Sequence, residues 1–356
     1  MWPDRRLLDV FNIDHPIIQA PMAGPATPAL AAAVCNAGGL GSLGCGESTP
    51  DQIRGAVAAM RQGTNRPFNL NFFVHEKPET DPDVLQRTLQ RVAPFYRELG
   101  LGDPPDTLPE IGPGFDDTRL ELLLDLRPAV VSFHFGVPEP NAIAALKSAG
   151  IILISTATTV AEAITLQSAG MDAVIAQGWE AGGHRGSHQP TEPAAGVGTL
   201  ALVPQIADAV RIPVIAAGGI ADGRGIAAAF ALGAAGVQLG TAFLSCPEAG
   251  TDPARRALLA TASETDTMMT DAVSGKSARA ARSRFAMAME ASRAPLPAFR
   301  QLYGLTGPLL AAGKDEVASF HLYGQSARLN RAIPAAELMT ALVAETAAAF
   351  ARLAQR

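Results

Sequence analysis

The sequence has few cysteines and no apolar run long enough to cross a bilayer. Its three cysteines, Cys35, Cys45 and Cys246, form no CxxC pair, so their spacing indicates neither a zinc site nor a dithiol redox motif. A sparse and odd number of cysteines is typical of a reducing compartment. The N-terminal segment also lacks the apolar core and the small-residue cleavage site of a signal peptide. We therefore expect a soluble, cytoplasmic protein without membrane contacts.

Charged residues are scarce as well. They make up 17% of the 356 residues, and the formal net charge of −6 is spread along the chain without a basic block. This distribution argues against nucleic acid as a partner. No GxGxxG motif follows the first candidate strand, which argues against a Rossmann dinucleotide site. Hydrophobic residues, at 48%, suffice for a large core, and the length suits two domains or one barrel with an extension.

Short apolar runs rich in Val, Ile and Leu are separated in several places by Ala-rich stretches with helical character. The candidate strands are residues 16–22, 39–45, 68–73, 129–135, 151–155, 173–177, 213–217 and 236–240. Strands that alternate with helices predict a parallel sheet covered by helices. Eight such units favour an α/β fold of the closed (β/α)₈ TIM-barrel type, with an open doubly wound sheet as the alternative.

Helix boundary signals support this alternation. Thr159 and Glu162 form a capping-box pattern at the start of a helix over 158–169. A second helix, over 225–232, ends at Gly233, which is suited to a left-handed stop.

Two segments exceed a minimal barrel. Residues 75–118 are rich in Pro, Asp and Glu, and predict an inserted helix and loop over the barrel mouth. Roughly a hundred residues remain after the eighth strand, too many for a βα loop. They include a candidate strand at 267–273 and an amphipathic helix at 334–355. We predict a barrel over 1–245 and a mainly helical extension or lid over 246–356, whose last helix packs back on the barrel.

Glycines follow the last two predicted strands, at the strand ends where barrel enzymes carry their active sites. Gly218 and Gly219 follow the seventh strand, and Gly240 and Thr241 follow the eighth. Glycine lets backbone N–H groups approach a phosphate, and a helix start adds a favourable dipole. Tight turns alone would also explain these glycines. Their occurrence after both strands favours a phosphate site.

Amide side chains end two other strands. Asn71 and Gln177 stand where a cofactor ring would lie, and Asn69 shares the inward face of its strand one layer deeper. A neutral amide can donate to or accept from the polar edge of such a ring. An amide at a strand end often caps the next turn instead. We predict a ligand role for Asn71 and Gln177, with Asn69 as a further candidate.

His134 ends the fourth strand between two aromatic residues. Strand alternation predicts that His134 points opposite to Phe133 and Phe135. An inward histidine near apolar walls would be neutral and able to act as a base near pH 7. A satisfied core histidine is the structural alternative. The strand-end position favours catalysis.

Other ionisable groups receive different interpretations. His184 and His188 have the i, i+4 spacing of a metal pair, but the surrounding glycines argue against the helix that such a pair needs, so we expect no metal. We predict instead that His184 lines the substrate pocket on a glycine-rich loop. Tyr303 and Tyr323 lie in the extension, and we predict that they line the same pocket. Lys276 is predicted to be a solvated charge.

Several of these motifs resemble the nitronate monooxygenase family, formerly called 2-nitropropane dioxygenases. They are QAPMAGP, SFHFG and QGWEAGGHRG at the first, fourth and sixth strands, and AAGGIADGRG and QLGTAFL at the last two. SGKSARAAR and YGQSARL resemble later family segments, so the resemblance runs from about Pro16 to Leu342. Lys276 and Ser277 stand where the family pattern has Arg-Pro, and Leu322 and Tyr323 stand where a small residue or Trp is usual. These departures concern substrate preference.

The resemblance implies a (β/α)₈ barrel with non-covalent FMN. It implies oxidation of alkyl nitronates such as propionate 3-nitronate, and of nitroalkanes, with O₂ as co-substrate, to carbonyl compound and nitrite through a flavin semiquinone. His134 matches the family's catalytic histidine. It would orient the nitronate or remove the α-proton of a nitroalkane. The predicted cofactor-binding residues are Ala20, Pro21, Met22, Asn69, Asn71, Gln177, Gly182, Gly183, Gly218, Gly219, Gln238, Leu239, Gly240 and Thr241. We expect a monomer or homodimer.

Three other functions fit parts of the pattern. An FMN-dependent NAD(P)H enoyl-thioester reductase or quinone reductase would use the same barrel, although SFHFG argues against it. A flavin-free phosphate-sugar isomerase or aldolase would need a Lys or Glu at a strand end, and Glu180 is the candidate there. A non-catalytic binding protein is disfavoured, since the converging polar strand ends predict a built site.

Overall fold

A computed structural model describes residues 2–79, 81–189 and 195–354. Its parallel strands are β1 (Ile17–Gln19), β2 (Gly41–Gly44), β3 (Phe68–Phe73), β4 (Val130–His134), β5 (Ile152–Ala157), β6 (Ala173–Gln177), β8 (Val214–Ala217) and β9 (Gly236–Leu239). They form one 8-stranded sheet in the order β1-β9-β8-β6-β5-β4-β3-β2. A parallel bridge between Ile18 and Leu40 joins the two edges. The predicted (β/α)₈ barrel is therefore confirmed, and the open sheet is excluded.

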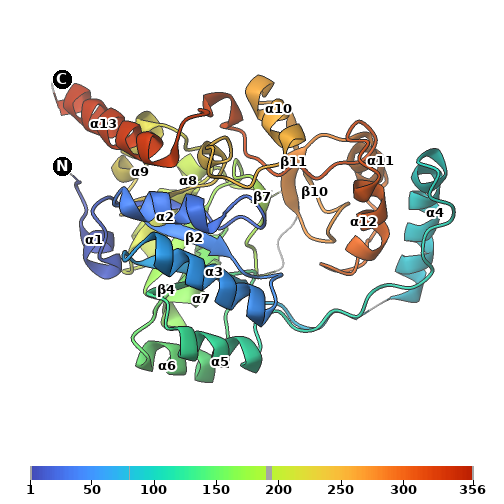
Figure 1. Cartoon of the computed structure of the whole chain (residues 1–356), viewed down its shortest axis with the longest axis horizontal. Helices are drawn as coiled ribbons and strands as arrows, with labels where there is room; N and C mark the ends of the chain where they lie inside the picture. The colour runs from blue at the N-terminus through green and yellow to red at the C-terminus, as the bar shows by residue number, and fades with distance from the viewer. Residues whose placement is uncertain (1, 80, 190–194, 355–356) are drawn as a thin grey trace.

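Helices cover the outside of this barrel (Figure 1). They are α2 (Pro28–Asn36), α3 (Pro50–Gly63), α5 (Asp117–Leu126), α6 (Pro140–Ser148), α7 (Val160–Ser168), α8 (Thr199–Ala209) and α9 (Gly223–Ala231). Thr159 caps α7 as expected, but the Glu162 carboxylate accepts from Thr158 rather than completing a capping box. Gly233 follows α9 with φ +94°, the left-handed stop predicted for it.

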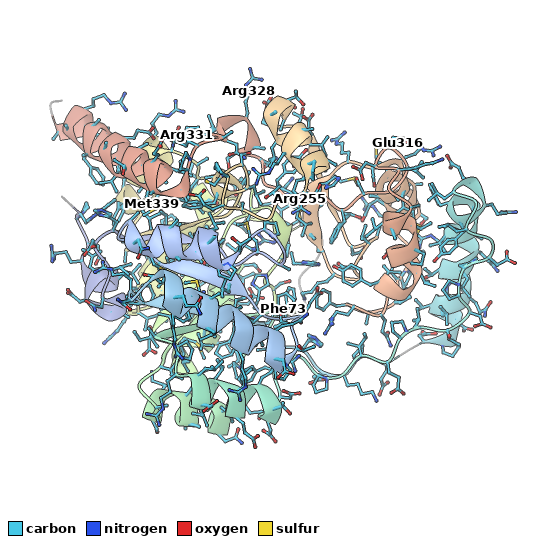
Figure 2. All side chains as sticks on the ribbon, in the orientation of Figure 1. Phe73, Arg255, Glu316, Arg328, Arg331 and Met339 are labelled. Carbon is cyan, nitrogen blue, oxygen red and sulfur yellow. The ribbon has the colours of Figure 1, made fainter. Side chains whose placement is uncertain are left out.

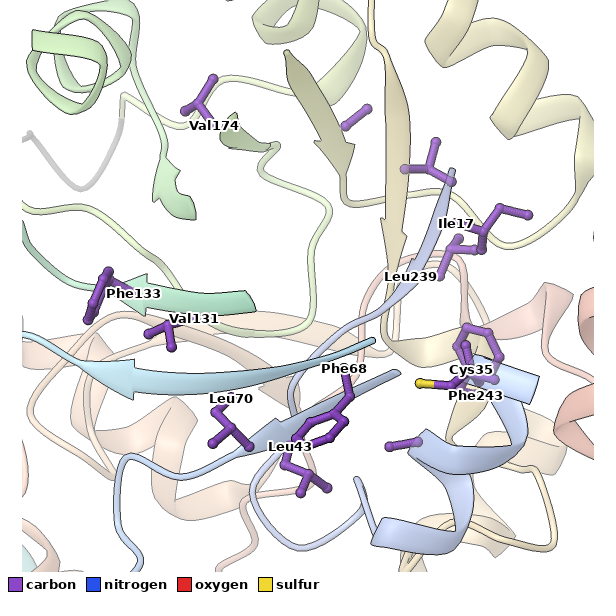
Figure 3. Close-up of a cluster of buried hydrophobic side chains, with 14 of the residues drawn as sticks. Ile17, Cys35, Leu43, Phe68, Leu70, Val131, Phe133, Val174, Leu239 and Phe243 are labelled. Atoms are coloured by element: carbon purple, nitrogen blue, oxygen red, sulfur yellow. The ribbon is translucent and has the colours of Figure 1, made fainter. Parts of the chain in front are cut away.

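The barrel has an apolar outer layer and an apolar floor. Outward residues of the strands join one buried cluster with residues of the surrounding helices, and Figure 3 labels Leu70, Val131 and Val174 in this cluster. At the amino ends of the strands, α1 (Arg6–Phe11) buries Leu7 and Phe11 against inward strand residues. Burying this much apolar surface is the main stabilising contribution to the barrel. α1 thus closes the amino ends of the strands.

The insertion and the extension pack against each other. The insertion contributes α4 (Pro82–Glu98), and the extension contributes α10 (Pro253–Thr261), α11 (Arg284–Ser292) and α12 (Tyr303–Ala311). Figure 1 shows α4 beside α11 and α12 and away from the barrel. The Tyr96 hydroxyl donates to the Leu305 carbonyl at 2.7 Å. We predicted a helix and loop over the mouth; the helix instead covers the outer side of the extension.

A small antiparallel sheet connects the extension to the barrel. The candidate strand at 267–273 is β10 (Thr267–Thr270), which pairs with β11 (Ala278–Ala281). β11 in turn pairs with β7 (Gly183–His184), a two-residue strand in the loop that follows β6. The glycine-rich loop after β6 is thus held by backbone hydrogen bonds from the extension.

The last helix, α13 (Ala335–Ala354), lies along the barrel. Leu338, Met339 and Leu342 join the core that α2 and α9 form with the strands. Figure 2 labels Met339 at this contact. The predicted last residue, Gln355, and residue 80 of the insertion lie outside the described residues. None of the described helices is long and apolar enough to span a membrane.

Candidate active site at the barrel mouth

Two sets of residues form the rim at the carboxyl ends of the strands. The histidine side consists of His134, Phe135 and the loop 178–189, and the glycine side consists of Gly218, Gly219, Gly240 and Thr241. Strand register determines both sides, since Phe73 lies opposite His134 and Ala217 lies opposite Gln238. The predicted strand-end residues therefore do meet at one end of the barrel.

Both ring nitrogens of His134 are hydrogen-bonded within the protein. Nε2 lies 3.2 Å from the His184 carbonyl oxygen. A carbonyl only accepts, so Nε2 carries the proton in the neutral ring. Nδ1 lies 3.0 Å from Thr156 Oγ1, which then donates its hydroxyl hydrogen. Thr156 and the His184 backbone thus fix the tautomer and the orientation of the ring.

Burial keeps His134 neutral. The pKa of His134 is lowered to about 4, mainly by the removal of water around the ring and in smaller part by the nearby cations Lys276 and Arg185. The same burial lowers the pKa of His184 to about 3. At neutral pH both rings are therefore neutral, as the sequence predicted for His134, and its role as a base stays a prediction.

Phe135 departs from the predicted alternation. Its φ of +75° lies in the left-handed region, which a bulky residue rarely adopts. This turn brings the Phe135 ring to 4.6 Å from the His134 ring, so the two side chains lie together instead of opposite each other. Backbone strain of this kind is concentrated at functional sites.

An aromatic cluster surrounds this turn. Phe299 from the extension packs edge-on against Phe135 at 4.9 Å and against Phe73 at 5.7 Å. Figure 2 shows Phe73 between the barrel and the extension. His184 also packs edge-on against Phe299, at 5.2 Å. The extension therefore supplies one apolar wall next to the catalytic candidate.

The other residues predicted to line the pocket have different surroundings. His184 Nε2 lies 2.9 Å from Ser274 Oγ, and the Tyr303 hydroxyl also bonds to Ser274. Tyr303 is thus joined to His184 through one serine, and burial raises its pKa. Tyr323 instead packs in an apolar cluster with Leu244 and Met22. Its role in substrate binding remains a prediction.

Buried polar groups hold the loop 178–189 in place. Gln177 donates to the His184 carbonyl at 2.9 Å and accepts from the Gly186 N–H at 2.8 Å. The buried Glu162 carboxylate accepts the backbone N–H groups of His188 and Gln189. Gln177 in this structure anchors the loop with both ends of its amide. Its role as a cofactor ligand stays a prediction.

Lys276 is not the solvated charge that the sequence indicated. Its ammonium donates to the Ser187 carbonyl at 3.0 Å and lies 4.7 Å from the centre of the Phe135 ring. Burial lowers its pKa. The loop between β10 and β11 brings this lysine to the histidine side of the rim. Periodicity in the sequence cannot show such a placement.

The glycine side offers backbone donors. Gly218 and Gly219 have φ of +109° and +72°, conformations that favour glycine. The N–H groups of Gly219, Ile220 and Gly240 have no acceptor among the residues that the structure describes. The Thr241 hydroxyl accepts from the Gly324 N–H at 2.9 Å, which leaves its own hydrogen to donate. This is the donor set expected of a phosphate site.

The segment after β1 borders the glycine side. The Ala20 N–H donates to the Leu239 carbonyl at 2.8 Å. A Cβ added at Gly240 would lie 3.5 Å from Ala20 Cβ and 3.8 Å from Met22 Sδ. Ala20, Pro21 and Met22 therefore run beside the end of β9, and their place beside a cofactor ring stays a prediction.

Two amides stand inside the barrel below the rim. Asn71 and Asn69 both donate to Ser132 Oγ at 2.9 Å, and Asn69 also donates to Ser42. Asn69 Oδ1 and Gln238 Oε1 are buried without a hydrogen-bond partner among the described residues. A buried acceptor without a donor is costly, which makes Gln238 a candidate for a hydrogen bond from a ligand.

Gly182 and Gly183, in the loop after β6, require glycine for different structural reasons. A Cβ added at Gly182 would lie 2.4 Å from Gly324 N, because the two backbones touch there. Gly183 has φ +79° with open space around it. Gly182 thus permits close contact between the loop and the extension, while Gly183 permits a left-handed backbone conformation at the start of β7. Their predicted role in cofactor binding is untested by these contacts.

Sequence reasoning missed four residues that shape this site. They are Thr156, Glu162, Ser274 and Phe299. Thr156 lies one residue before the end of β5, next to β4, so a search of every strand end for hydroxyl groups would have found it. The other three reach the rim only through tertiary packing, for which the sequence carries no local signal.

A closed barrel with a neutral histidine at the carboxyl ends of its strands, and with N–H donors there that have no acceptor among the described residues, is typical of (β/α)₈-barrel enzymes, which carry their active sites at this end. The sequence profile described as "Nitronate monooxygenase" matches residues 4–345, and the chain belongs to this family of oxidoreductases.

Individual relatives agree with this assignment. Nitronate monooxygenases of Paraburkholderia phytofirmans and Pseudomonas aeruginosa are 46% and 45% identical to this chain, over 99% and 96% of its length and 97% and 98% of theirs. A nitroalkane oxidase from Streptomyces ansochromogenes is 40% identical in sequence. Its crystal structure matches this one with a TM-score of 0.88, over 98% of this chain and 99% of that one. FabK from Thermotoga maritima is 34% identical, with a TM-score of 0.77 over 98% of both chains.

Proposed function

We propose that this enzyme oxidises alkyl nitronates with FMN as cofactor and O₂ as oxidant, yielding a carbonyl compound and nitrite. The observation that carries the proposal is the position of neutral His134 at the same barrel mouth as the unpaired N–H donors of the glycine side. The names of the relatives support a nitronate or a nitroalkane as the substrate.

The residues present suit FMN. Backbone donors at Gly219, Ile220 and Gly240 would hold the phosphate, with Thr241 Oγ1 as an added donor. Gln238 Oε1, a buried acceptor without a partner among the described residues, would take an N–H from the ring edge. Bound there, FMN would supply the electron acceptor, and the protein would supply geometry and field.

His134 would orient the substrate and, for a neutral nitroalkane, take its α-proton. The C–H electron pair would then move onto the nitro group, and the ring would become an imidazolium. In the neutral ring Nδ1 carries the only lone pair, so the Thr156 hydroxyl, 3.0 Å away, would have to turn its hydrogen elsewhere before Nδ1 takes the proton from the substrate. The aromatic wall of Phe73, Phe135 and Phe299 would exclude water from this step.

Product analysis tests the proposal. Purified protein loaded with FMN should consume O₂ and release nitrite from ethyl nitronate and from propionate 3-nitronate. Protein freed of flavin should do neither until FMN is restored. No nitrite from either nitronate with FMN bound would refute the proposal.

One alternative function, a reductase that uses NAD(P)H, is supported by the similarity to FabK. The similarity to FabK leaves an NAD(P)H-dependent enoyl-thioester or quinone reductase on the same barrel to be tested. Such an enzyme would oxidise NADH or NADPH with a crotonyl thioester or a quinone, without nitrite release from nitronates. Running both assays on one preparation separates the two functions.

A further inference from the structure

We propose that Lys276 is the cation that binds the anionic nitro group of the substrate, and so favours nitronates over neutral nitroalkanes. This inference rests on the proposed function. It assigns the recognition of negative charge to one side chain of the extension and leaves proton transfer to His134.

The buried charges near the loop 178–189 do not balance. Lys276 and Arg185 both interact with the Glu162 carboxylate, and Arg185 and Arg279 both interact with Glu180. These three cations face two carboxylates, while the pKa of His134 keeps that ring neutral. The surplus is one positive charge in partly desolvated surroundings, where an anion would be attracted strongly.

Both carboxylates are already bound to fixed donors. Glu162 accepts from the His188 N–H at 2.8 Å and from the Thr158 hydroxyl at 2.8 Å. Glu180 accepts from the Thr199 N–H and hydroxyl, each at 2.9 Å. Neither forms an ion pair with Lys276 in the described structure. The lysine therefore keeps its charge available for a ligand.

The donors of the ammonium group leave room for that ligand. One N–H is used by the Ser187 carbonyl at 3.0 Å, and the Phe135 ring lies beside the group at 4.7 Å. An ammonium group has three donors. The remaining donor capacity suits one or two oxygens of a planar anion.

Phe135 places this cation near the proposed reacting centre. The strained turn at φ +75° holds the Phe135 ring 4.6 Å from the His134 ring and 4.7 Å from Lys276 Nζ. Imidazole and ammonium therefore border the same aromatic ring. A nitronate whose carbon faces the His134 ring can turn an oxygen toward Lys276, because a hydrogen bond from the ammonium spans about 3 Å.

Nitrate, a planar anion with oxygens on nitrogen, is the probe for the test. Isothermal titration of the oxidised FMN enzyme should show nitrate binding, and nitrate should compete with ethyl nitronate. In Lys276→Met we expect the nitrate Kd and the KM for ethyl nitronate to rise about 10- to 100-fold, the loss expected for a charged hydrogen bond. The KM for neutral nitroethane should rise far less. Lys276→Arg keeps the positive charge, so its nitrate Kd and its KM for ethyl nitronate should stay close to those of the wild type.

Lys314→Met, an exposed lysine of the extension, is the matched control and should leave all three constants unchanged. Equal losses for ethyl nitronate and nitroethane in Lys276→Met would overturn the inference. So would a wild-type enzyme that does not bind nitrate, a result independent of whether the variant folds. Lys276-dependent nitrate binding without nitrite release would instead uphold the anion site and refute the proposed function.

Discussion

The two sides of the barrel rim are built differently. On the histidine side, side chains from β4, β5, β6 and the extension hold one another through hydrogen bonds and ring contacts, as His134, Thr156 and Gln177 show. On the glycine side, the backbone itself is shaped, with φ of +109° at Gly218 and +72° at Gly219. One side suits proton transfer and charge recognition, and the other suits phosphate binding.

This difference has a consequence for mutation. A side-chain change on the histidine side should alter turnover while leaving cofactor affinity nearly intact. A backbone change on the glycine side should do the reverse. If substitutions on either side changed turnover and FMN affinity equally, the two sides of the rim would not have separate functions.

The largest effect is expected at His134. His134→Asn removes the base but keeps an amide of similar size, so kcat/KM for nitroethane should fall at least about 100-fold, the usual contribution of a general base. Turnover of preformed ethyl nitronate, which needs no deprotonation, should fall much less. Steady-state oxygen consumption with both substrates measures this. Equal losses for the two substrates would argue against the base role. A changed FMN affinity would show that the histidine side also contributes to cofactor binding.

A smaller effect is expected on the glycine side. Gly219→Ala forces a Cβ into φ +72°, which costs about 1–2 kcal/mol and should weaken FMN binding about tenfold. Gly233→Ala is the matched control, since Gly233 has φ +94° at the end of α9, outside the rim. It should lower the melting temperature without changing the FMN Kd measured by fluorescence. Equal loss of FMN affinity in both variants would remove the evidence for a phosphate site.

A mild effect is expected at Tyr303. Tyr303→Phe removes the hydroxyl that bonds to Ser274 and so loosens His184, which should lower kcat/KM for nitronate about threefold, the value of one neutral hydrogen bond. Tyr96→Phe removes a comparable hydroxyl between α4 and α12 and should affect only stability. If Tyr96→Phe impaired turnover as much, Tyr303 would have no special connection to the rim.

The smallest effect is the pH dependence near neutrality. A base must be unprotonated, and burial lowers the pKa of His134 from 6.5 to about 4. The kcat/KM for nitroethane should therefore stay constant as pH falls from 8 to about 5 and reach half its value near pH 4. Since His134 is neutral in the fold above that value, a midpoint near 6.5 would show that its surroundings are solvated.

Much of the barrel could be predicted from the sequence, because strand and helix signals are local. The run at 173–177 coincides with β6, and the glycine pair after β8 and Gly240 after β9 lie at the strand ends where barrel geometry places a phosphate site. The register of the neighbouring strands β6, β8 and β9 places Gln177 and Gln238 at the same rim. Residues at strand ends are thus accessible to sequence reasoning even when their partners are not.

The rest depended on long-range packing. The φ of Phe135 reversed the predicted side of its ring, and no local pattern specifies a left-handed phenylalanine. Lys276 reaches the rim because β11 pairs with the two-residue strand β7, which is too short for a periodicity signal. The amide of Gln177 anchors a loop, a role that only the folded contacts reveal.

The central claim, that the rim binds FMN and lets a nitronate reduce it, can be tested without oxygen. Ethyl nitronate is mixed anaerobically with the purified FMN-loaded enzyme, and the visible flavin absorbance is followed beside a sample that receives NADPH. The proposed function predicts a rapid loss of flavin absorbance with the nitronate. A flavin that ignores the nitronate and is fully bleached by NADPH would contradict it and identify the enzyme as a reductase.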